Sequence, residues 1–438
     1  MILEDYLKKN AEVYPEKVAI ICDGENVTYS RLFSLVTCRA TRLKEEGICE
    51  GKIVPLVASR SVDYLVNYFA IHIVGAVAVP LEENIPDELF NDISERLSVC
   101  AVPNGTADIL FTTGTTGKSK GVIISHLAIM ADAENLIFSQ QFCHDNVFII
   151  SGPLNHVGCL TKVYPIIMLG GTLYLISGMK NIDDFFFALD YPCNKMATFL
   201  VPASIRILLQ FSKERLAEYA EKIDFIETGA APMSRSDMLK ICEILPNSRL
   251  YNTYASTETG IIATYNYNDG RCISGCLGKP MKHSRFFITE EGTIACQGDT
   301  LMSGYAGDEQ MTVSILRDNT IFTSDYGEID SEGMLRLLGR KDDVINVGGF
   351  KVAPSEVEEV VLALPEVKDC ICISASHPIM GNVLKLLVVL NNGYELDKKK
   401  IAIYIKSKLE SYKIPMVYQA VEAIQRTFNG KINRKFYN

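Results

Sequence analysis

The sequence predicts an α/β protein with a large multi-layer N-terminal domain of sheets and helices and a small α+β C-terminal domain. Three observations support this. The chain has 438 residues, which at about 150 residues per domain suggests two or three units. Apolar runs of strand length alternate with segments of helical periodicity. A charged link led by Gly339 separates residues 1–339 from residues 340–438.

The elements of the large domain follow from local pattern. Short apolar runs at 18–21, 53–57 and 108–111 predict strands, and residues 29–46 predict a helix that ends before a glycine. The most apolar run, 65–81, contains polar residues and a proline, so it falls short of the ~20 clean residues of a membrane span. A buried helix that leads into a strand fits it better.

The last hundred residues carry their own set of elements. Pro354 opens a segment whose apolar residues recur at helical spacing up to Leu364. Strands are expected at 370–374 and 384–390, and an amphipathic helix over 398–409. Together these elements predict a separate small domain.

Composition limits the function. The formal net charge of −10 argues against a broad surface for nucleic acid or anionic membranes, although one pocket could still bind a single anion. The thirteen cysteines form no CxxC pair, which favours reduced thiols and a cytoplasmic protein. The first residues are acidic and show no apolar signal core.

The strongest local signal is a loop rich in threonine and glycine directly after the strand at 108–111. Its glycines let the backbone approach a ligand closely, and its hydroxyl and ammonium groups donate to phosphate oxygens. Only two residues separate Gly114 from Gly117, so the loop is not a Walker A motif. The alternative is a flexible surface turn. The candidate residues are Thr112, Thr113, Gly114, Thr115, Thr116, Gly117 and Lys120.

This loop resembles the phosphate-binding signature of the adenylate-forming (AMP-binding) superfamily, which includes acyl- and aryl-CoA ligases such as 4-coumarate–CoA ligase and long-chain fatty acid–CoA ligase. Further motifs resemble that superfamily in the expected order over nearly the whole chain. They are Gly229-Ala230-Ala231-Pro232, Asn252 to Glu258, Thr323-Ser324-Asp325, Gly339 to Asp342, and Asn429-Gly430-Lys431-Ile432.

The resemblance implies roles for these residues. Gly229 to Pro232 and Asn252 would contact adenine, Tyr254 would stack on the ring, and Asp325 and Arg340 would bind the ribose. Thr257 would face the α-phosphate, Glu258 would hold Mg²⁺, and Lys120 and the loop threonines would hold the outer phosphates of ATP. Lys431 would be the catalytic lysine, brought in by a mobile small domain that pivots at Asp342.

The implied reaction joins a small carboxylic acid to AMP and then passes the acyl group to the thiol of CoA. His156, in the segment 153–158, would border the carboxylate pocket, and its alternative role is a hydrogen-bonded core histidine. The segment has no aspartate for a substrate ammonium, so an amino acid is disfavoured. A carrier protein is the alternative acceptor, and a non-catalytic nucleotide-binding protein is the alternative of another class.

The chain departs from the superfamily pattern in a few places. Only 27 residues separate Pro80 from Asp108, where relatives usually have more, so the N-terminal domain is shortened there. Ser324 replaces a usual glycine, and Asn346 replaces a common lysine. None of these changes removes a group expected to act in catalysis. They weaken the predictions of the acid substrate and of the acyl acceptor more than the prediction of adenylation.

Overall fold

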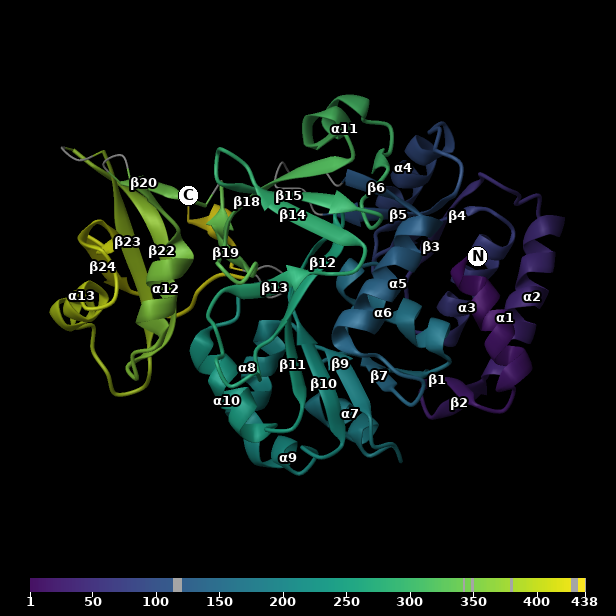
Figure 1. Ribbon diagram of the computed structural model, residues 1–438, viewed down its shortest axis with the longest axis horizontal. Helices are drawn as coiled ribbons and strands as arrows, with labels where there is room; N and C mark the ends of the chain where they lie inside the picture. The colour runs from purple at the N-terminus through teal and green to yellow at the C-terminus, as the bar shows by residue number, and fades with distance from the viewer. Residues whose placement is uncertain (113–119, 342, 348–349, 379–380, 427–431, 438) are drawn as a thin grey trace.

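A computed structural model describes residues 1–112, 120–341, 343–347, 350–378, 381–426 and 432–437. The expected α/β class is confirmed: two large sheets and their helices make up most of the chain, and the elements after residue 340 form a separate lobe (Figure 1). Among the described residues, no helix combines the length and the apolarity that crossing a membrane would require.

The larger sheet has a parallel half and an antiparallel half. In the parallel half, buried apolar strands lie in the order β11-β10-β9-β7-β8-β1, with β2 antiparallel to β1 at the edge. Strands buried on both faces read as continuous apolar runs, as β1 and β7 do, whereas β10 and β11 also carry polar side chains. Their bounds are β1 Val18–Cys22, β2 Glu25–Thr28, β7 Val147–Ile150, β8 Thr172–Leu175, β9 Met196–Phe199, β10 Ile223–Thr228 and β11 Arg249–Ser256.

The antiparallel half continues from β11 in the order β12-β13-β19-β18-β15-β14, with β17 paired to β18. Neighbouring strands in this half run antiparallel, and some pairs, such as β13 with β19, join segments that are far apart in the chain. Their bounds are β12 Gly260–Asn266, β13 Cys276–Pro280, β14 Ser284–Ile288, β15 Thr293–Gly298, β17 Leu316–Arg317, β18 Thr320–Ile329 and β19 Leu335–Arg340.

The second sheet has the order β16-β6-β5-β4-β3. The apolar run at 65–81 becomes helix α3 followed by β4, as predicted. A single helix, α4, fills the short connection between β4 and its parallel neighbour β5. The bounds are β3 Ile53–Val57, α3 Val62–Ile73, β4 Val77–Leu81, α4 Asp87–Ser98, β5 Thr106–Thr112, β6 Lys120–Ser125 and β16 Gly304–Tyr305.

Helices cover the two sheets and close the core between them. Helix α5 packs on α6 and against β12, while α6 packs on β7, β8 and α1. Thr28, Ser61 and Ser125 accept hydrogen bonds from backbone amides at the starts of α2, α3 and α5. The remaining helices are α1 Leu3–Val13, α2 Tyr29–Glu45, α5 His126–Gln140, α6 Val157–Leu169, α7 Ile182–Leu189, α8 Pro202–Phe211, α9 Lys213–Ala217, α10 Arg235–Ile244 and α11 Glu309–Ile315.

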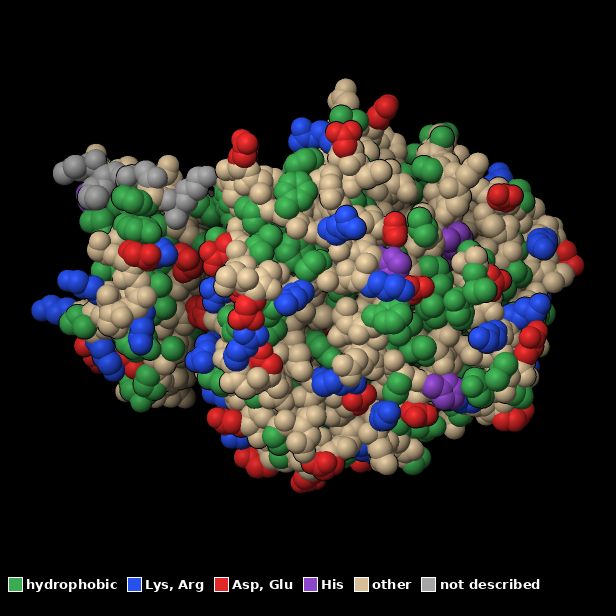
Figure 2. Space-filling view, in the orientation of Figure 1, with side chains coloured by type: hydrophobic (Ala, Val, Ile, Leu, Met, Phe, Trp, Pro, Cys, Tyr) green, Lys and Arg blue, Asp and Glu red, His purple; other side chains and the backbone are tan. Residues whose placement is uncertain are grey.

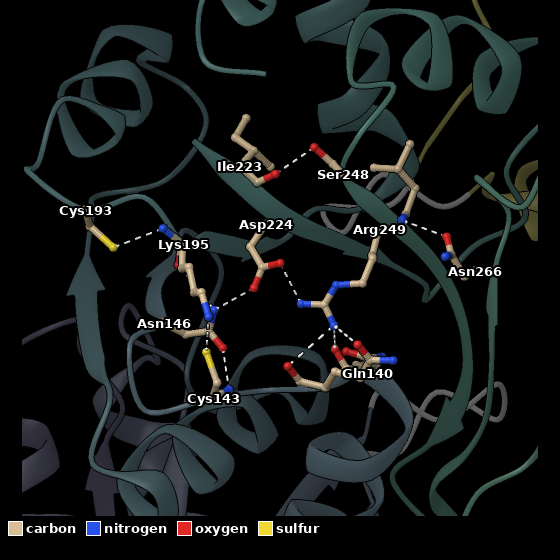
Figure 3. Close-up of polar contacts among 12 residues, drawn as sticks. Gln140, Cys143, Asn146, Cys193, Lys195, Ile223, Asp224, Ser248, Arg249 and Asn266 are labelled. Carbon is tan, nitrogen blue, oxygen red and sulfur yellow. Dashed lines mark hydrogen bonds and ion pairs between the residues drawn. The ribbon is translucent and has the colours of Figure 1, made fainter. Parts of the chain in front are cut away.

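A polar cluster fixes the starts of the central parallel strands (Figure 3). Asp224 on β10 accepts from Arg249 Nη2 at 2.7 Å and from Asn146 Nδ2 at 3.0 Å. Arg249 on β11 also donates to the carbonyl of Gln140 at the end of α5. Because the chain enters β10 and β11 at this cluster, their opposite ends are held in register for the site described below.

The lobe after β19 has its own apolar core, which contains residues between Ile345 and Tyr418. Helix α12 packs on β22 and on α13, and β23 lies between β22 and β24. The predicted helices and strands of this lobe are present, although α13 ends three residues earlier than expected. The bounds are β20 Ile345–Val347, β21 Phe350–Val352, α12 Pro354–Leu362, β22 Val367–His377, β23 Gly381–Leu390, α13 Lys398–Lys406, β24 Val417–Ala420 and the 3₁₀ turns Ser411–Lys413 and Arg434–Phe436.

On the face in Figure 2, basic side chains are scattered among acidic ones and form no continuous field. All thirteen cysteines are free thiols in the structure, and six of them are exposed or half-buried.

Candidate active site

The β5–β6 hairpin holds both ends of the threonine-glycine loop. The two strands pair antiparallel, and Thr112 lies opposite Lys120 at the base of the loop. The site residues predicted between them, Thr113, Gly114, Thr115, Thr116 and Gly117, lie outside the described residues. The hairpin therefore fixes where the loop leaves and re-enters the second sheet.

Glu258 lies in the turn between β11 and β12, next to Thr257. Ser256 and Thr259 tie this turn together, each accepting from the other's backbone amide at 3.1 Å. The Glu258 carbonyl also accepts from Met302 N at 2.8 Å. The turn is thus held at both its start and its end, which fixes the direction of the Glu258 side chain.

Tyr305 links Glu258 to Lys120 on the β5–β6 hairpin. Its hydroxyl donates to Glu258 Oε1 at 2.9 Å, and Lys120 Nζ lies 5.5 Å from the centroid of its ring. Burial, together with the Glu258 carboxylate, raises the pKa of Tyr305, which therefore stays a donor at neutral pH. Sequence reasoning missed Tyr305, since nothing in the local pattern distinguishes it from the other tyrosines.

Glu258 has the chemistry of a ligand for a hard divalent cation. In the described part of the chain, its Oε2 receives no hydrogen bond, and the residue is only half-buried. One carboxylate oxygen of Glu258 is held by Tyr305, and the other is available to a cation. This arrangement fits Mg²⁺, which in proteins usually binds one or two carboxylates together with substrate phosphates. The residues present therefore fit the predicted metal.

Asp325 joins the two other predicted nucleotide-binding groups. The buried Tyr254 hydroxyl donates to Asp325 Oδ2 at 2.8 Å, and Arg340 Nε lies 3.3 Å from Oδ1. Asp325 and Arg340 are also backbone partners across β18 and β19. Burial, followed by the Asp325 carboxylate, raises the pKa of Tyr254 well above its usual range. The Asp325 carboxylate thus holds both the Tyr254 hydroxyl and the Arg340 guanidinium.

The turn after β10 lies beside β11, where Asn252 is the parallel neighbour of Thr228. A Cβ on Gly229 would be 3.0 Å from the Thr253 carbonyl oxygen, so a larger residue would fit tightly at this position. Ala230 has a φ of +65°, an uncommon conformation for a residue with a side chain, and it precedes Ala231 and the exposed Pro232. The buried Asn252 donates its Nδ2 to the Cys276 carbonyl at 2.9 Å, which fixes the orientation of its amide.

His156 is the residue that precedes α6, and it is half-buried. Its carbonyl accepts from the amides of Cys159 and Leu160 in the first turn. The structure therefore places the ring at the entrance of a helix that runs into the core. Lys431 and the expected pivot Asp342 lie outside the described residues, so their predicted roles stay predictions.

The described candidates gather around the exit of β11. This strand supplies Asn252 and Tyr254 and leads into the Glu258 turn, while Asp325 and Arg340 come from β18 and β19, and Gly229 from the end of β10. Tyr305 connects this group to the β5–β6 hairpin. The set offers an aromatic face, amide and carboxylate acceptors, two cations and a carboxylate open to a metal, which together suit a nucleotide with its phosphates.

Known proteins are similar to this chain in sequence and in fold. The chain is 26% identical over 479 aligned positions to a 2-succinylbenzoate–CoA ligase of Bacillus cereus, covering 99% of this chain and 97% of that one. Its fold is similar to ATP-bound MatB from Rhodopseudomonas palustris, with a TM-score of 0.86 and 23% identity over 100% and 98% of the two chains. It is also similar to the o-succinylbenzoate CoA synthetase MenE from Bacillus subtilis in complex with its acyl-adenylate intermediate, with a TM-score of 0.84 and 22% identity over 99% and 97%.

The family comparison covers most of the chain. Residues 7–102 and 91–306 match the AMP-binding enzyme family, and residues 356–431 match the AMP-binding enzyme C-terminal domain. The two N-terminal matches overlap at residues 91–102, which lie in the shortened connection between Pro80 and Asp108. The chain therefore belongs to the AMP-binding enzyme family.

Proposed function

We propose that this enzyme activates a small carboxylic acid with ATP and then transfers the acyl group to the thiol of CoA. The observation that carries the proposal is the convergence at the β11 exit: Tyr254, Asp325 and Arg340 form one connected group, and Glu258, Tyr305 and Lys120 form the other. The first group suits the adenosine and the second suits the phosphates. The similarity to a CoA ligase along 99% of the chain supports the complete reaction.

The first half-reaction would join the acid to AMP. A carboxylate oxygen attacks the α-phosphorus of ATP, the bond to the β-phosphate breaks, and pyrophosphate leaves. Thr112, Lys120 and the loop between them would hold the outer phosphates, and Thr257 would face the α-phosphate. Mg²⁺, held by Glu258, would supply positive charge that offsets the phosphate oxygens. The contribution of these residues is positioning and electrostatic stabilisation.

The second half-reaction would form the thioester. The CoA sulfur attacks the acyl carbon, its proton goes to solvent, the carbon–oxygen bond to AMP breaks, and AMP leaves. We place the division of labour at residue 340: residues 1–339 bind the acid and ATP, and residues 340–438 turn about Asp342 to bring Lys431 in and out. Ser355 Oγ donates to the Leu338 carbonyl at 3.3 Å, a contact that such a rotation would have to break.

The first test is acid-dependent release of pyrophosphate from Mg²⁺ and ATP, measured with and without CoA. The acids tested are aryl, short, medium and long, and include 2-succinylbenzoate. We expect one acid class to trigger release and CoA to sustain turnover. A single burst that CoA does not relieve would identify a carrier protein as acceptor. Absence of release with every acid, in a protein that binds ATP, would refute enzymatic activation.

Variants test the residues. Lys431→Ala should lower the adenylation rate by about 10²–10³-fold, the scale of losing one electrostatic donor of ~3–4 kcal/mol. Its affinity for ATP should change little. Lys399→Ala on the exposed face of α13 is the matched control and should leave the rate unchanged. Glu258→Gln should raise the Mg²⁺ concentration needed for half-maximal rate. A Lys431→Ala variant with the wild-type rate would contradict the role given to this lysine.

A further inference from the structure

A lysine and a glutamate form an ion pair in the core behind the candidate active site. Lys162 on α6 and Glu227 on β10 place Nζ and Oε1 2.8 Å apart, and their side chains are 0% and 1% exposed. Burying two charges costs several kcal/mol per ion unless their remaining hydrogen-bonding capacity is also satisfied. A pair at this depth is therefore expected to have further partners.

This pair has bonding capacity that the described residues do not use. Glu227 Oε2 is buried and has no hydrogen-bond partner among them. The Lys162 ammonium has three N–H donors, and in the described part of the chain only Glu227 accepts from it. The pair thus presents an open acceptor and open donors side by side. Most buried polar groups in native proteins have a partner, so these openings point to a missing one.

The ring of Phe199 connects the pair to the nucleotide site. Lys162 Nζ lies 5.6 Å from the centroid of this ring. A Cβ on Gly158 would be 3.1 Å from the ring, and a Cβ on Gly229 would be 3.6 Å from it. Gly158 follows His156 by two residues, and Gly229 opens the turn next to Asn252. The ring therefore lies close to two segments of the site and to the ammonium of the ion pair.

We propose that Lys162 and Glu227 form the closed end of the acid pocket and select an acid with a hydroxyl group opposite its carboxylate. This inference rests on the proposed function, because it assigns the substrate class of that same site. A hydroxyl donates one hydrogen bond and accepts another, so it fills both openings at once: it donates to Glu227 Oε2 and accepts from Lys162 Nζ. Because a hydroxyl is uncharged, the net charge of the ion pair stays at zero.

Other end groups fit less well. A second carboxylate or an ammonium would meet one opposite and one like charge of the pair, and either would leave the buried site with a net charge. A methyl or hydrogen end would leave Glu227 Oε2 without a partner. The distance along α6 from His156 to Lys162 is six residues, or about 9 Å at 1.5 Å per residue. That length suits one aromatic ring or a short chain better than a long acyl chain.

The test compares matched acids in the full-length wild-type protein. The panel is 4-hydroxybenzoate, benzoate, 4-methoxybenzoate and terephthalate, and in the aliphatic series 6-hydroxyhexanoate, hexanoate and adipate. We expect the hydroxy acid of at least one series to exceed its deoxy analogue by about 10²-fold or more in kcat/KM, because a site built for a hydroxyl strongly rejects the analogue without it. Equal or better use of the deoxy acid or the dicarboxylate in both series would overturn the inference, and would indicate that ordered water fills the openings.

A double variant, Lys162→Met with Glu227→Leu, tests the residues themselves. It replaces the pair by apolar side chains of similar size, which avoids leaving one buried charge alone. The preference for the hydroxyl should fall below about tenfold, with ATP affinity unchanged. If the variant retains the wild-type preference, the pair does not select the acid. If the variant does not fold, the wild-type panel decides alone.

Binding of non-reactive acyl-sulfamoyl adenosines separates this inference from the proposed function. These compounds mimic the acyl-adenylate and need no turnover. The hydroxybenzoyl compound should bind at least tenfold more tightly than the benzoyl compound. If acids are activated but neither rates nor binding favour the hydroxyl, the inference fails and the proposed function stands. If no acid is activated and neither compound binds, both fail.

Discussion

Three charged side chains meet in the core beside β5, the strand that leads into the threonine-glycine loop. His72 on α3 places Nδ1 2.9 Å from Glu4 Oε1 on α1, and Nε2 3.1 Å from Asp108 Oδ1 on β5. Tyr68 donates its hydroxyl to Asp108 Oδ2 at 2.8 Å. All three charged side chains are 2% exposed or less. Because Asp108 lies four residues before Thr112, this cluster anchors the strand that carries the loop.

Burial opposes a charged His72, but the Glu4 and Asp108 carboxylates outweigh it and raise the pKa of His72 to about 10, against an ordinary value of 6.5. The folded-state pKa is thus above the unfolded one. The stabilisation from His72 is complete below pH 6.5 and is lost as the pH rises through about 10. Within that window the free energy of unfolding should fall by about 1.4 kcal/mol per pH unit, or about 3 kcal/mol between pH 7 and pH 9.

The perturbation is His72→Leu, which leaves two buried carboxylates facing each other. Removing one partner of a buried ion pair costs about 3–5 kcal/mol, so the variant should be destabilised at pH 7 by at least that amount. The triple variant Glu4→Gln, His72→Leu, Asp108→Asn removes all three charges and keeps an acceptor for Tyr68. It should recover most of the loss, since neutral replacement of a whole buried cluster is often tolerated.

The assay is urea unfolding followed by circular dichroism at several pH values, since the chain has no tryptophan for fluorescence. The informative quantity is the difference between the wild type and the triple variant, because other groups titrate equally in both. The wild type should lose stability relative to the triple variant between pH 7 and pH 9. Parallel loss in the two proteins, or a His72→Leu variant as stable as the wild type, would refute the reasoning.

Three further predictions concern the nucleotide site and the sheet that supports it. Tyr254→Phe keeps the aromatic ring and removes the hydrogen bond to Asp325, which is worth about 1.5–3 kcal/mol because its acceptor is charged. In steady-state kinetics, KM for ATP should therefore rise about tenfold or more, while kcat should change less. Gly278→Ala should abolish folding or cost more than about 4 kcal/mol, since its Cβ would lie 1.9 Å from a backbone oxygen. Gly333→Ala, also at positive φ but with open space, is its control and should cost about 1 kcal/mol by thermal unfolding. Asp224→Ala should destabilise the sheet by about 1–3 kcal/mol in urea because it leaves the Arg249 guanidinium without its carboxylate; an unchanged midpoint would contradict this.

The local elements could be predicted from the sequence because their signals are local. The helix at 29–46 and the strands at 53–57 and 108–111 appear as α2, β3 and β5, with ends shifted by at most two residues. Apolar periodicity and a terminal glycine act within one element and do not depend on its neighbours. The placement of the threonine-glycine loop directly after a strand is local in the same way.

The helices and strands after residue 340 could also be predicted, but their detailed bounds could not. The strands expected at 370–374 and 384–390 are both longer in the structure, at Val367–His377 and Gly381–Leu390. Their polar ends extend the hairpin because each backbone group finds a partner on the opposite strand. Strand pairing, which the sequence pattern does not contain, decides where such strands end.

The sequence by itself determined which residues are candidates for the site, since the motifs expected to serve adenine, ribose, phosphate and metal are short and contiguous. Only the tertiary structure decided how they are connected. Tyr305 reaches Glu258 from a strand of the other sheet, Tyr254 shares Asp325 with Arg340, and Lys162 meets Glu227 in the core. Each of these contacts joins residues that are far apart in the chain. They form because the packing of sheets and helices brings those side chains within hydrogen-bond distance, and no pattern within one segment records that packing.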